Sequence, residues 1–472
     1  MSRKLSVSKL GLLVVLTCLA RMSGMPTDNS NAREISQYDR VKGGRSGQDN
    51  AAHLPPDYPN CLPPRKGATR RDPIYGRAIK RLTDSTKPGP GEPQSMTAEY
   101  ATQNHFNADE TAIFVTYSGH DAQGFNKSVV QILDAGSGDL LYDLPIAINN
   151  EPMWDCSDPN VLYFHAGNAL RKMVLGPEGT STNSLIHTFV EYTSISSTGE
   201  SDISPDGKKI IFVGRVRTRE KRARERDRDV FVYTLPDRAN PEGKKGPVLD
   251  IAGSALDKAQ ITNHFVVLGF NDFRCMGART SLYDHKMNLL WEMGRYSGHG
   301  DAGMDSERNE VYYTSSADAP VDDRNYQHCV NSILKFDLAH GSVTCLETGD
   351  PAFDWSLANH IAAPDQPSPW VYVSTHAPCD PDPGRTDPSC QWKPYTNEIL
   401  RIRSDGSGKI ERLAHHHSRP HGKDSYAWQP RVSVNRDGTK VLFNSNYGLH
   451  HKRTSCHCKV SEEYTDVYLV IP

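Results

Sequence analysis

Polar groups containing histidine, arginine or a carboxylate recur along this chain, each a few residues before a turn and an apolar segment. Histidine accepts or donates a proton near neutral pH, and arginine binds a carboxylate through two parallel hydrogen bonds. Acids, bases and hydrogen-bond donors together suit a polar, acidic ligand such as a sugar chain. The members of these groups are His105, Glu151, Glu200, Asp202, His299, Asp301, Asn359, His360, Gln429 and Arg431.

One reaction open to these residue types is β-elimination at a uronate sugar. The carboxylate beside C5 must be neutralised, a base must remove the C5 proton, and an acid must protonate the departing oxygen. We expect Arg431 with Gln429 to neutralise the carboxylate and His299 or His360 to act as the base. The other histidine or Tyr426 would be the acid, with His105 in reserve. The residues expected to bind substrate are Gln429, Glu151, Glu200, Asp202, Asp301 and Asn359.

The polar groups belong to a repeating unit, in which a turn rich in Asp, Pro, Asn or Gly precedes a strongly apolar strand. Six clear copies begin at Gln103, Asn150, Gly199, Gly298, Ala358 and Trp428. A weaker seventh copy lies between Gly253 and Phe273, where ITNHFVVLGF supplies a strand without the turn signal. Such a regular order favours an all-β, seven-bladed β-propeller over a β-sandwich. The polar groups would then line its central funnel.

The ends of the chain suggest three regions. Residues 1–24 resemble a signal peptide, because a basic start precedes the apolar run Leu10–Ala20, which is too short to cross a bilayer. Residues 25–70 form an extension rich in proline and polar residues, and 71–472 form the propeller. Strand-like Tyr75–Thr83 is expected to pair with the C-terminal blade and close the ring. We therefore expect a secreted, extracellular protein without a membrane span.

Charge narrows the range of partners. A net charge of -3 over 472 residues argues against a nucleic-acid binder, and we expect a monomer that binds an acidic polysaccharide or oligosaccharide. The charged stretch at 215–229 is either a solvated hairpin with alternating ion pairs or an arm that attracts such a glycan. Asn126 begins an N-glycosylation sequon.

Cysteines and histidines offer further chemistry. An exported protein can form disulfides, and the candidate pairs are Cys329 with Cys345 and Cys379 with Cys390. Export removes Cys18 and leaves an odd number of cysteines, so at least one thiol is unpaired or binds metal. The candidate metal ligands near the C-terminus are His451, Cys456, His457 and Cys458.

Thiolate and imidazole together favour zinc, although calcium or manganese is also open, in a structural or a catalytic role. Alternatively, one or both of Cys456 and Cys458 form disulfides with Cys275 or Cys156. The sequence HHHSRPH at 415–421 is a second possible metal-binding stretch, which we expect to lie exposed in a polar loop.

The opening IKRLT…QNHFNADETAIFV resembles the first blade of oligogalacturonate-lyase-type propellers. The closing WQPRVSVNRDGTKVLFNSNYG is similar to the last blade of the same broad group, which includes propeller ulvan lyases and TolB-like propellers. The resemblance spans most of residues 70–472 and implies a polysaccharide lyase. Those lyases place metal-binding histidines near a glutamine before the final turn. Here Gln429 is retained, but Pro430 and Arg431 follow it.

Three functions remain open from the sequence. The leading one is a secreted polysaccharide lyase that acts on a uronate-containing glycan. The first alternative is a non-catalytic extracellular propeller that binds a glycan or a protein. The second alternative is a propeller glycoside hydrolase that uses two carboxylates such as Glu151 and Glu200.

Overall fold

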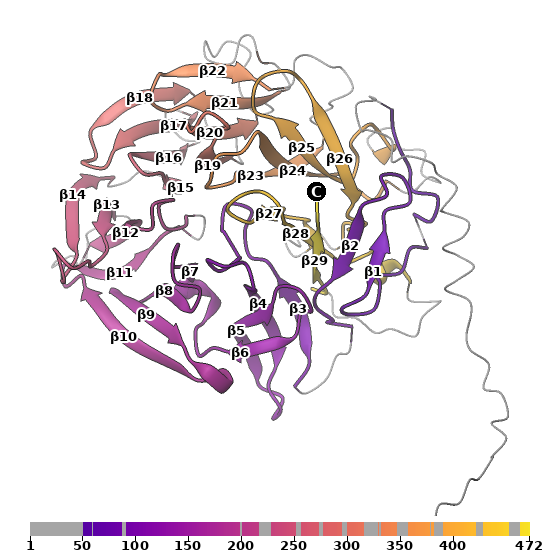
Figure 1. Ribbon diagram of the computed structural model, residues 1–472, viewed down its shortest axis with the longest axis horizontal. Helices are drawn as coiled ribbons and strands as arrows, with labels where there is room; N and C mark the ends of the chain where they lie inside the picture. The colour runs from indigo at the N-terminus through magenta and orange to yellow at the C-terminus, as the bar shows by residue number, and fades with distance from the viewer. Residues whose placement is uncertain are drawn as a thin grey trace, which may run out of the picture. The chain divides into compact units, whose positions relative to one another are not determined.

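Seven antiparallel sheets surround a common axis in the described part of the chain (Figure 1). The computed structural model describes residues 51–58, 60–86, 91–198, 201–216, 228–251, 256–272, 277–294, 300–315, 329, 332–346, 357–377, 379–381, 390–421, 428–452 and 463–472. The first 50 residues, with the predicted signal peptide, lie outside these ranges. The predicted all-β, seven-bladed propeller is confirmed.

Each of the first six blades has four strands, which run outward from the axis in sequence order. Blade 1 consists of β3 (Pro93–Thr97), β4 (Ala112–His120), β5 (Asn126–Asp134) and β6 (Leu140–Asp143). Blade 2 consists of β7 (Met153–Trp154), β8 (Val161–Ala166), β9 (Ala169–Leu175) and β10 (Ser181–Thr188). Blade 3 consists of β11 (Tyr192–Ser196), β12 (Lys209–Val216), β13 (Arg228–Thr234) and β14 (Lys244–Asp250).

The next three blades repeat this arrangement. Blade 4 consists of β15 (Leu256–Ile261), β16 (Phe265–Asp272), β17 (Gly277–Asp284) and β18 (Leu289–Gly294). Blade 5 consists of β19 (Gly300–Met304), β20 (Glu310–Ser315), β21 (Ile333–Asp337) and β22 (Ser342–Cys345). Blade 6 consists of β23 (Ala358–Ala362), β24 (Trp370–His376), β25 (Glu398–Arg403) and β26 (Ile410–His415). Short 3-10 helices are η1 (Ile148–Asn150), η2 (Pro177–Gly179) and η5 (Leu449–Lys452).

Blade 7 closes the ring with strands from both ends of the propeller. Its order from the axis is β27 (Ser433–Val434), β28 (Val441–Ser445), β29 (Asp466–Val470), β2 (Ala78–Arg81) and β1 (Thr69–Arg71). Figure 1 shows indigo β1 and β2 beside yellow β29. β2 pairs antiparallel with β29, so the predicted closure by Tyr75–Thr83 is confirmed. Arg81 Nη2 also donates to Asp466 Oδ2 at 2.6 Å, which adds a buried ion pair to the junction.

The apolar strand of each repeat serves two cores at once. In β12, Ile210 and Phe212 pack in the core shared with blade 2, whereas Ile211 and Val213 pack in the core shared with blade 4. Side chains alternate across a strand, so a strand buried on both faces must be apolar at every position. This requirement explains the continuous apolar runs such as KIIFV that carried the prediction.

The weak seventh copy is blade 4. β15 and β16 form an antiparallel pair within it, as expected. Their connection has no glycine or aspartate, because Thr262 closes it instead: Phe265 N donates to Thr262 Oγ1 at 3.1 Å and Thr262 N to Phe265 O at 2.9 Å. Asn263 is the single usual turn residue in this connection, which is why its sequence signal is weak.

Candidate functional site

An irregular loop, residues 98–105, fills the channel along the propeller axis. It leaves blade 1 after β3 and rejoins the sheet at the bridge between Phe106 and Ile113. Its side chains and backbone contact blades 3, 4, 6 and 7, which only a segment crossing the axis can do. We call it the channel loop. It positions the candidate site, because the polar residues of the inner strands meet it from several sides.

Tyr100, in the channel loop, stands at the centre of an aromatic and basic group. Lys258 of β15 donates from Nζ to Tyr100 Oη at 2.9 Å, and the Tyr100 ring packs edge-on against His360 of β23 with centroids 5.8 Å apart. His360 stacks on His376 at 5.6 Å, and His376 meets Trp428 at 5.2 Å. We call these five residues the basic–aromatic cluster. Three blades and the channel loop contribute to it.

Arg431 adds a second positive charge beside the channel loop. Its Nη1 donates to the carbonyl oxygen of Glu99, the residue before Tyr100. The amide of Glu99 in turn donates to His105 Nε2 at 2.8 Å, and the other nitrogen of His105 lies 2.9 Å from Ser433 Oγ. Both ring nitrogens of His105 are thus engaged by the fold. Burial lowers the pKa of His105 to about 3, so it is neutral.

Glu151 lines a pocket next to the channel loop. The pocket has a volume of ≈ 250 Å³, and its walls include Glu99, Gln103 and Glu151. One carboxylate oxygen of Glu151 accepts hydrogen bonds from the amide and hydroxyl of Ser197, and His165 Nε2 lies 3.0 Å from the same oxygen. These contacts fix the orientation of the Glu151 carboxylate at the pocket wall.

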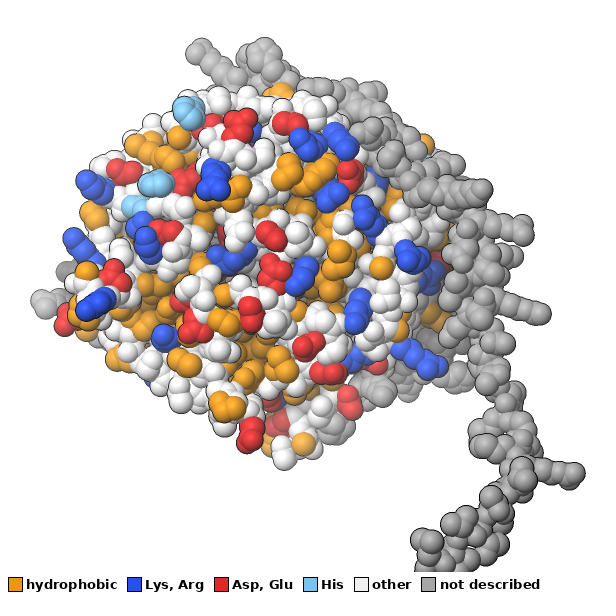
Figure 2. Space-filling model, viewed as in Figure 1, with side chains coloured by type: hydrophobic (Ala, Val, Ile, Leu, Met, Phe, Trp, Pro, Cys, Tyr) orange, Lys and Arg blue, Asp and Glu red, His pale blue; other side chains and the backbone are white. Residues whose placement is uncertain are grey.

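A second group, the acidic cluster, surrounds a cavity of ≈ 20 Å³ on the channel loop. It consists of Asp202, Asp301 and Asp365, with Arg436 beside them. The amide of Asn104 donates to Asp202 Oδ2 at 2.8 Å, and the amide of Ala363 donates to Asp301 Oδ2 at 2.6 Å. The cavity has room for a single water molecule. Figure 2 shows acidic and basic side chains interspersed over the face of the molecule, including its centre.

The acidic cluster holds its protons unusually tightly. Burial, reinforced by the neighbouring Asp365, raises the pKa of Asp202 to about 7, although Arg436 opposes the rise. Burial also raises the pKa of Asp301 well above its usual value, and it raises the pKa of Asp365. Three carboxylates face one guanidinium, so protonation at neutral pH reduces their mutual repulsion.

Several buried polar atoms of the inner strands and their approaches have no hydrogen-bond partner among the described residues. Four are amide oxygens and one is an imidazole nitrogen: Gln103 Oε1, Gln260 Oε1, Asn359 Oδ1, Gln429 Oε1 and His376 Nδ1. Buried polar atoms in native proteins are normally satisfied by protein, water or ligand. Acceptors of this kind match the hydroxyl donors of a sugar.

The sequence-predicted residues fall into three sets. His360 belongs to the basic–aromatic cluster, Arg431 binds the channel loop, and Glu151 lies at the adjoining pocket, whereas Asn359 and Gln429 each carry a buried amide oxygen without a described partner. Asp202 and Asp301 meet in the acidic cluster, while His105 is held within the fold. Outside the described residues lie His299, Glu200 and Tyr426, as well as Cys456, His457 and Cys458. His451 belongs to η5, and its side chain is also outside the description.

The sequence analysis missed six residues of these clusters, among them Trp428, which it used only as the start of a repeat. Lys258 lies in the blade with the weak turn signal, so no inner strand was aligned there. Tyr100 lies in the channel loop, outside the repeating unit, so the repeat pattern does not point to it. His376 stands at the end of β24, and Asp365 and Arg436 belong to the turns of their repeats, where Asp and polar residues are expected for structural reasons.

The two predicted disulfides are confirmed. Cys329 is bonded to Cys345, and Cys379 is bonded to Cys390. Both are consistent with an oxidising compartment. Cys156 forms no disulfide with any described residue, and its thiol donates to the carbonyl of Ser204 at 3.6 Å. Within the described ranges, no helix combines the length and apolar character needed to span a bilayer.

The expectation that HHHSRPH lies exposed is wrong. His415, His416 and His417 are all buried. His415 Nδ1 lies 3.0 Å from Asp72 Oδ2, and although burial opposes the charge, Asp72 raises the pKa of His415 to about 9. The stretch is buried because the residues between 51 and 72 pack over it, a contact across the whole chain that a local pattern cannot reveal. His417 also joins Asp57 in a group of possible metal ligands.

Comparison with known proteins gives the fold but no family. No family model matches the chain, and no curated protein matches it. An oligogalacturonate lyase in complex with manganese is 13% identical with a TM-score of 0.51, covering 86% of this chain and 96% of the lyase. An acylaminoacyl peptidase of Pyrococcus horikoshii is 9% identical with a TM-score of 0.42, over 73% of this chain and 48% of its own.

The β-propeller domain of the Trilobed protease from Pyrococcus furiosus is 10% identical with a TM-score of 0.41, over 74% of this chain and 88% of that domain. At these identities the likeness concerns the fold alone. The chain is thus a seven-bladed β-propeller, distantly similar in structure to propellers of differing function.

A divalent metal does not fit the described residues of the channel. The guanidinium of Arg431 lies beside the channel loop, and its positive charge repels a cation there. Among the described residues, the one group of three or more His, Cys, Asp or Glu ligand atoms within 4.8 Å is Asp57, Cys61 and His417. Any reaction in the channel would therefore use its side chains and no metal ion.

Proposed function

We propose that this protein is a secreted polysaccharide lyase that cleaves a uronate-containing glycan by β-elimination in the propeller channel. The observation that carries the proposal is the meeting of Tyr100, Lys258 and His360 beside Arg431. Two cations, a phenol and an imidazole are what the reaction requires. The fold similarity to an oligogalacturonate lyase and the predicted signal peptide are in keeping with it.

Each member of the site has a role in the proposal. Arg431 and Lys258 neutralise the uronate carboxylate. They thereby also stabilise the negative charge that develops at C5 when its proton is removed. His360 removes the C5 proton as the base. Tyr100 donates its hydroxyl proton to the departing oxygen, and Lys258, which donates to the phenol oxygen, stabilises the phenolate that remains. The C5–H and C4–O bonds break, and a C4=C5 double bond forms.

Substrate reaches this site from the pocket beside the channel loop. Gln103 and Glu151 at its wall, together with Gln429, would hold the hydroxyl groups of neighbouring sugars. His360 is fully buried behind Tyr100 and His376, so the Tyr100 side chain must shift to admit the reacting sugar. His376 stays neutral, because burial lowers its pKa to about 4, and it supports the ring of His360.

The test uses substitutions that each remove one reactive group from the site. Wild-type protein is incubated with a panel of uronate polysaccharides, and unsaturated products are measured by their ultraviolet absorbance. Tyr100→Phe and His360→Gln should each lower the rate by about 10²–10⁴-fold, the usual value of general acid–base catalysis. Tyr142→Phe is the control, because Tyr142 lies on the outer strand β6 and its hydroxyl donates to the Gly176 carbonyl, away from the site. Equal rates in all three variants would exclude this assignment.

A second candidate function is a non-catalytic propeller that binds an extracellular glycan or protein. The burial of Arg431 and His360, at 4% and 0% exposed, favours it, since an enzyme needs its reacting groups within reach of substrate. Such a protein would bind a glycan of the panel saturably, without releasing any product. Binding with no product from any member of the panel would favour this function over the lyase.

A further inference from the structure

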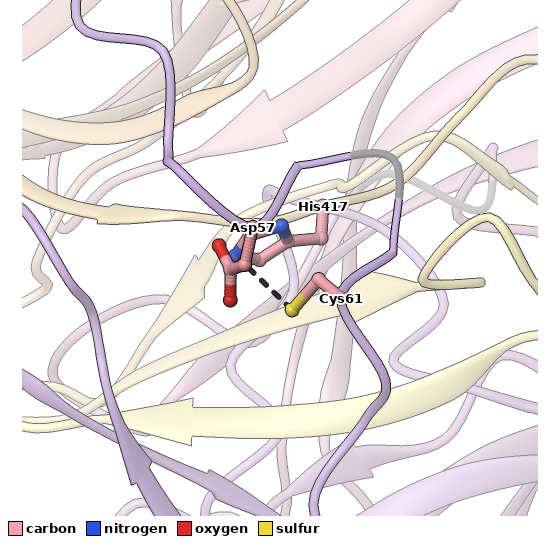
Figure 3. Close-up of side chains that lie close together, drawn as sticks. All are labelled: Asp57, Cys61 and His417. Atoms are coloured by element: carbon pink, nitrogen blue, oxygen red, sulfur yellow. Dashed lines mark hydrogen bonds between the residues drawn. The ribbon is translucent and has the colours of Figure 1, made fainter. Parts of the chain in front are cut away.

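Three metal-ligating side chains meet at the outer part of blades 6 and 7, away from the groups considered so far. Asp57 and Cys61 come from the N-terminal segment (residues 51–58 and 60–72), and His417 follows β26. One ligand atom from each lies within 4.8 Å of the other two, and Figure 3 shows the three side chains converging. Cys61 Sγ is 3.9 Å from His417 Nε2.

The imidazole of His417 is held firmly in this position. It stacks on Tyr447 with centroids 5.0 Å apart, and Tyr58 stacks at 6.3 Å. Its backbone has φ +54°, a left-handed conformation that is costly for a side chain other than glycine and that directs the ring. Cys61 and His417 are buried, whereas Asp57 is partly exposed. The site is therefore pre-formed and open only on the side of Asp57.

The hydrogen bonding of this group is incomplete. His417 Nδ1 has no hydrogen-bond partner among the described residues, although it is buried. The carboxylate oxygens of Asp57 accept no hydrogen bond of regular geometry there, while Arg70 lies against Oδ2 as an ion pair. Buried polar groups left in this state are rare in native proteins. Because Arg70 engages one oxygen, the other remains for a ligand.

The donor set identifies the class of ligand. Sulfur and imidazole donors with one carboxylate suit zinc, whereas magnesium, calcium and manganese prefer oxygen donors. Three protein ligands leave a fourth tetrahedral position for water. A hydrogen bond between thiol and imidazole would use the same pair without Asp57, whereas a zinc ion would use all three side chains.

We propose that Asp57, Cys61 and His417 bind a zinc ion that ties the N-terminal segment to the closing blades of the propeller. The segment includes β1 and leads into β2, and these two strands complete blade 7. The zinc would thus act on the ring closure, independently of the reaction proposed for the channel. Removing it should loosen the segment before the propeller itself.

Cobalt serves as the optical probe for the site. Metal-free full-length protein, titrated with cobalt, should show thiolate-to-cobalt charge-transfer absorption at one ion per chain, and zinc should displace it. Cys61→Ser and His417→Ala should lower cobalt affinity by more than the ~10–100-fold that loss of an outer-sphere partner costs. Cys156→Ser, which removes a thiol outside both disulfides, is the matched control and should leave affinity unchanged.

A second readout uses unmutated protein, so it does not depend on how the variants fold. Alkylation of the Cys61 peptide is followed by mass spectrometry with zinc and after chelation. The proposal expects at least a tenfold slower reaction with zinc bound. Equal alkylation in both states, or a cobalt spectrum unchanged by Cys61→Ser, would place any metal elsewhere and overturn the proposal.

Discussion

Asp202 should make the stability of the propeller depend on pH in a direction opposite to that of most carboxylates. Its pKa is about 7 in the folded protein, mainly through burial and then through Asp365, against 3.8 for an ordinary aspartate. The folded state therefore binds the proton more tightly than the unfolded chain. The resulting stabilisation is complete below pH 3.8 and is lost as the pH rises through 7.

The magnitude follows from that difference. At 1.36 kcal/mol per pKa unit, the difference between the folded and unfolded pKa of Asp202 corresponds to a loss of at most about 4 kcal/mol of unfolding free energy between acid and neutral pH. Asp202→Asn cannot ionise, so this dependence disappears. The variant also loses one of two acceptors, because Asp202 Oδ1 and Oδ2 accept from the amides of Ile203 and Asn104, each at 2.8 Å. That loss costs about 1–3 kcal/mol at every pH.

The assay is urea unfolding of wild type and variant from pH 4 to pH 8, followed by tryptophan fluorescence. Asp202→Asn should be the less stable protein at pH 4 and should equal or exceed wild type at pH 8. Asp139→Asn, at an exposed turn between β5 and β6, is the control and should shift little. A stability difference between wild type and Asp202→Asn that stays constant over this range would refute the argument.

Two further predictions concern buried polar and covalent links. Glu398→Gln should destabilise the protein by about 3–5 kcal/mol, because it leaves the buried Arg412 guanidinium without its carboxylate. Glu411→Gln breaks a more exposed pair with Arg401 and should cost at most about 1 kcal/mol in the same urea assay. Replacing Cys379 and Cys390 by serine should lower the free energy of unfolding by about 2–3 kcal/mol, as expected for a loop closed over 11 residues. If wild-type protein were equally stable under reducing and non-reducing conditions, the prediction would be wrong.

The blades were predictable because their signal is local. A turn with Asp or Gly followed by a strand that faces two cores leaves the same pattern in every copy, as the β12 run Lys209–Val216 illustrates. Ring closure was predictable for a similar reason, since β29 lacked a partner and the strand-like β2 was available. The two cysteines of each disulfide lie near each other in sequence, within a single blade, so they could be paired by their spacing.

The candidate site was only partly predictable, because it depends on contacts across the ring. Inner-strand positions identified His360, Arg431 and Asp202. Nothing in the sequence around Tyr100 indicates that it reaches Lys258, which lies 158 residues away on a blade beyond the axis. The burial of the 415–417 histidines has the same origin, because the covering segment precedes them by more than 300 residues. Local polarity suggested solvent, whereas long-range packing placed them inside.

The masses of the products show whether the channel performs the proposed elimination. Wild-type protein is incubated with each uronate polysaccharide of the panel, and the masses of the fragments are measured by mass spectrometry. Elimination adds no atoms, so we expect fragment masses that sum to the intact chain, with a double bond at each new non-reducing end. One added water per cleavage would indicate a hydrolase, and an uncut panel would indicate that the channel only binds; either result would exclude the lyase.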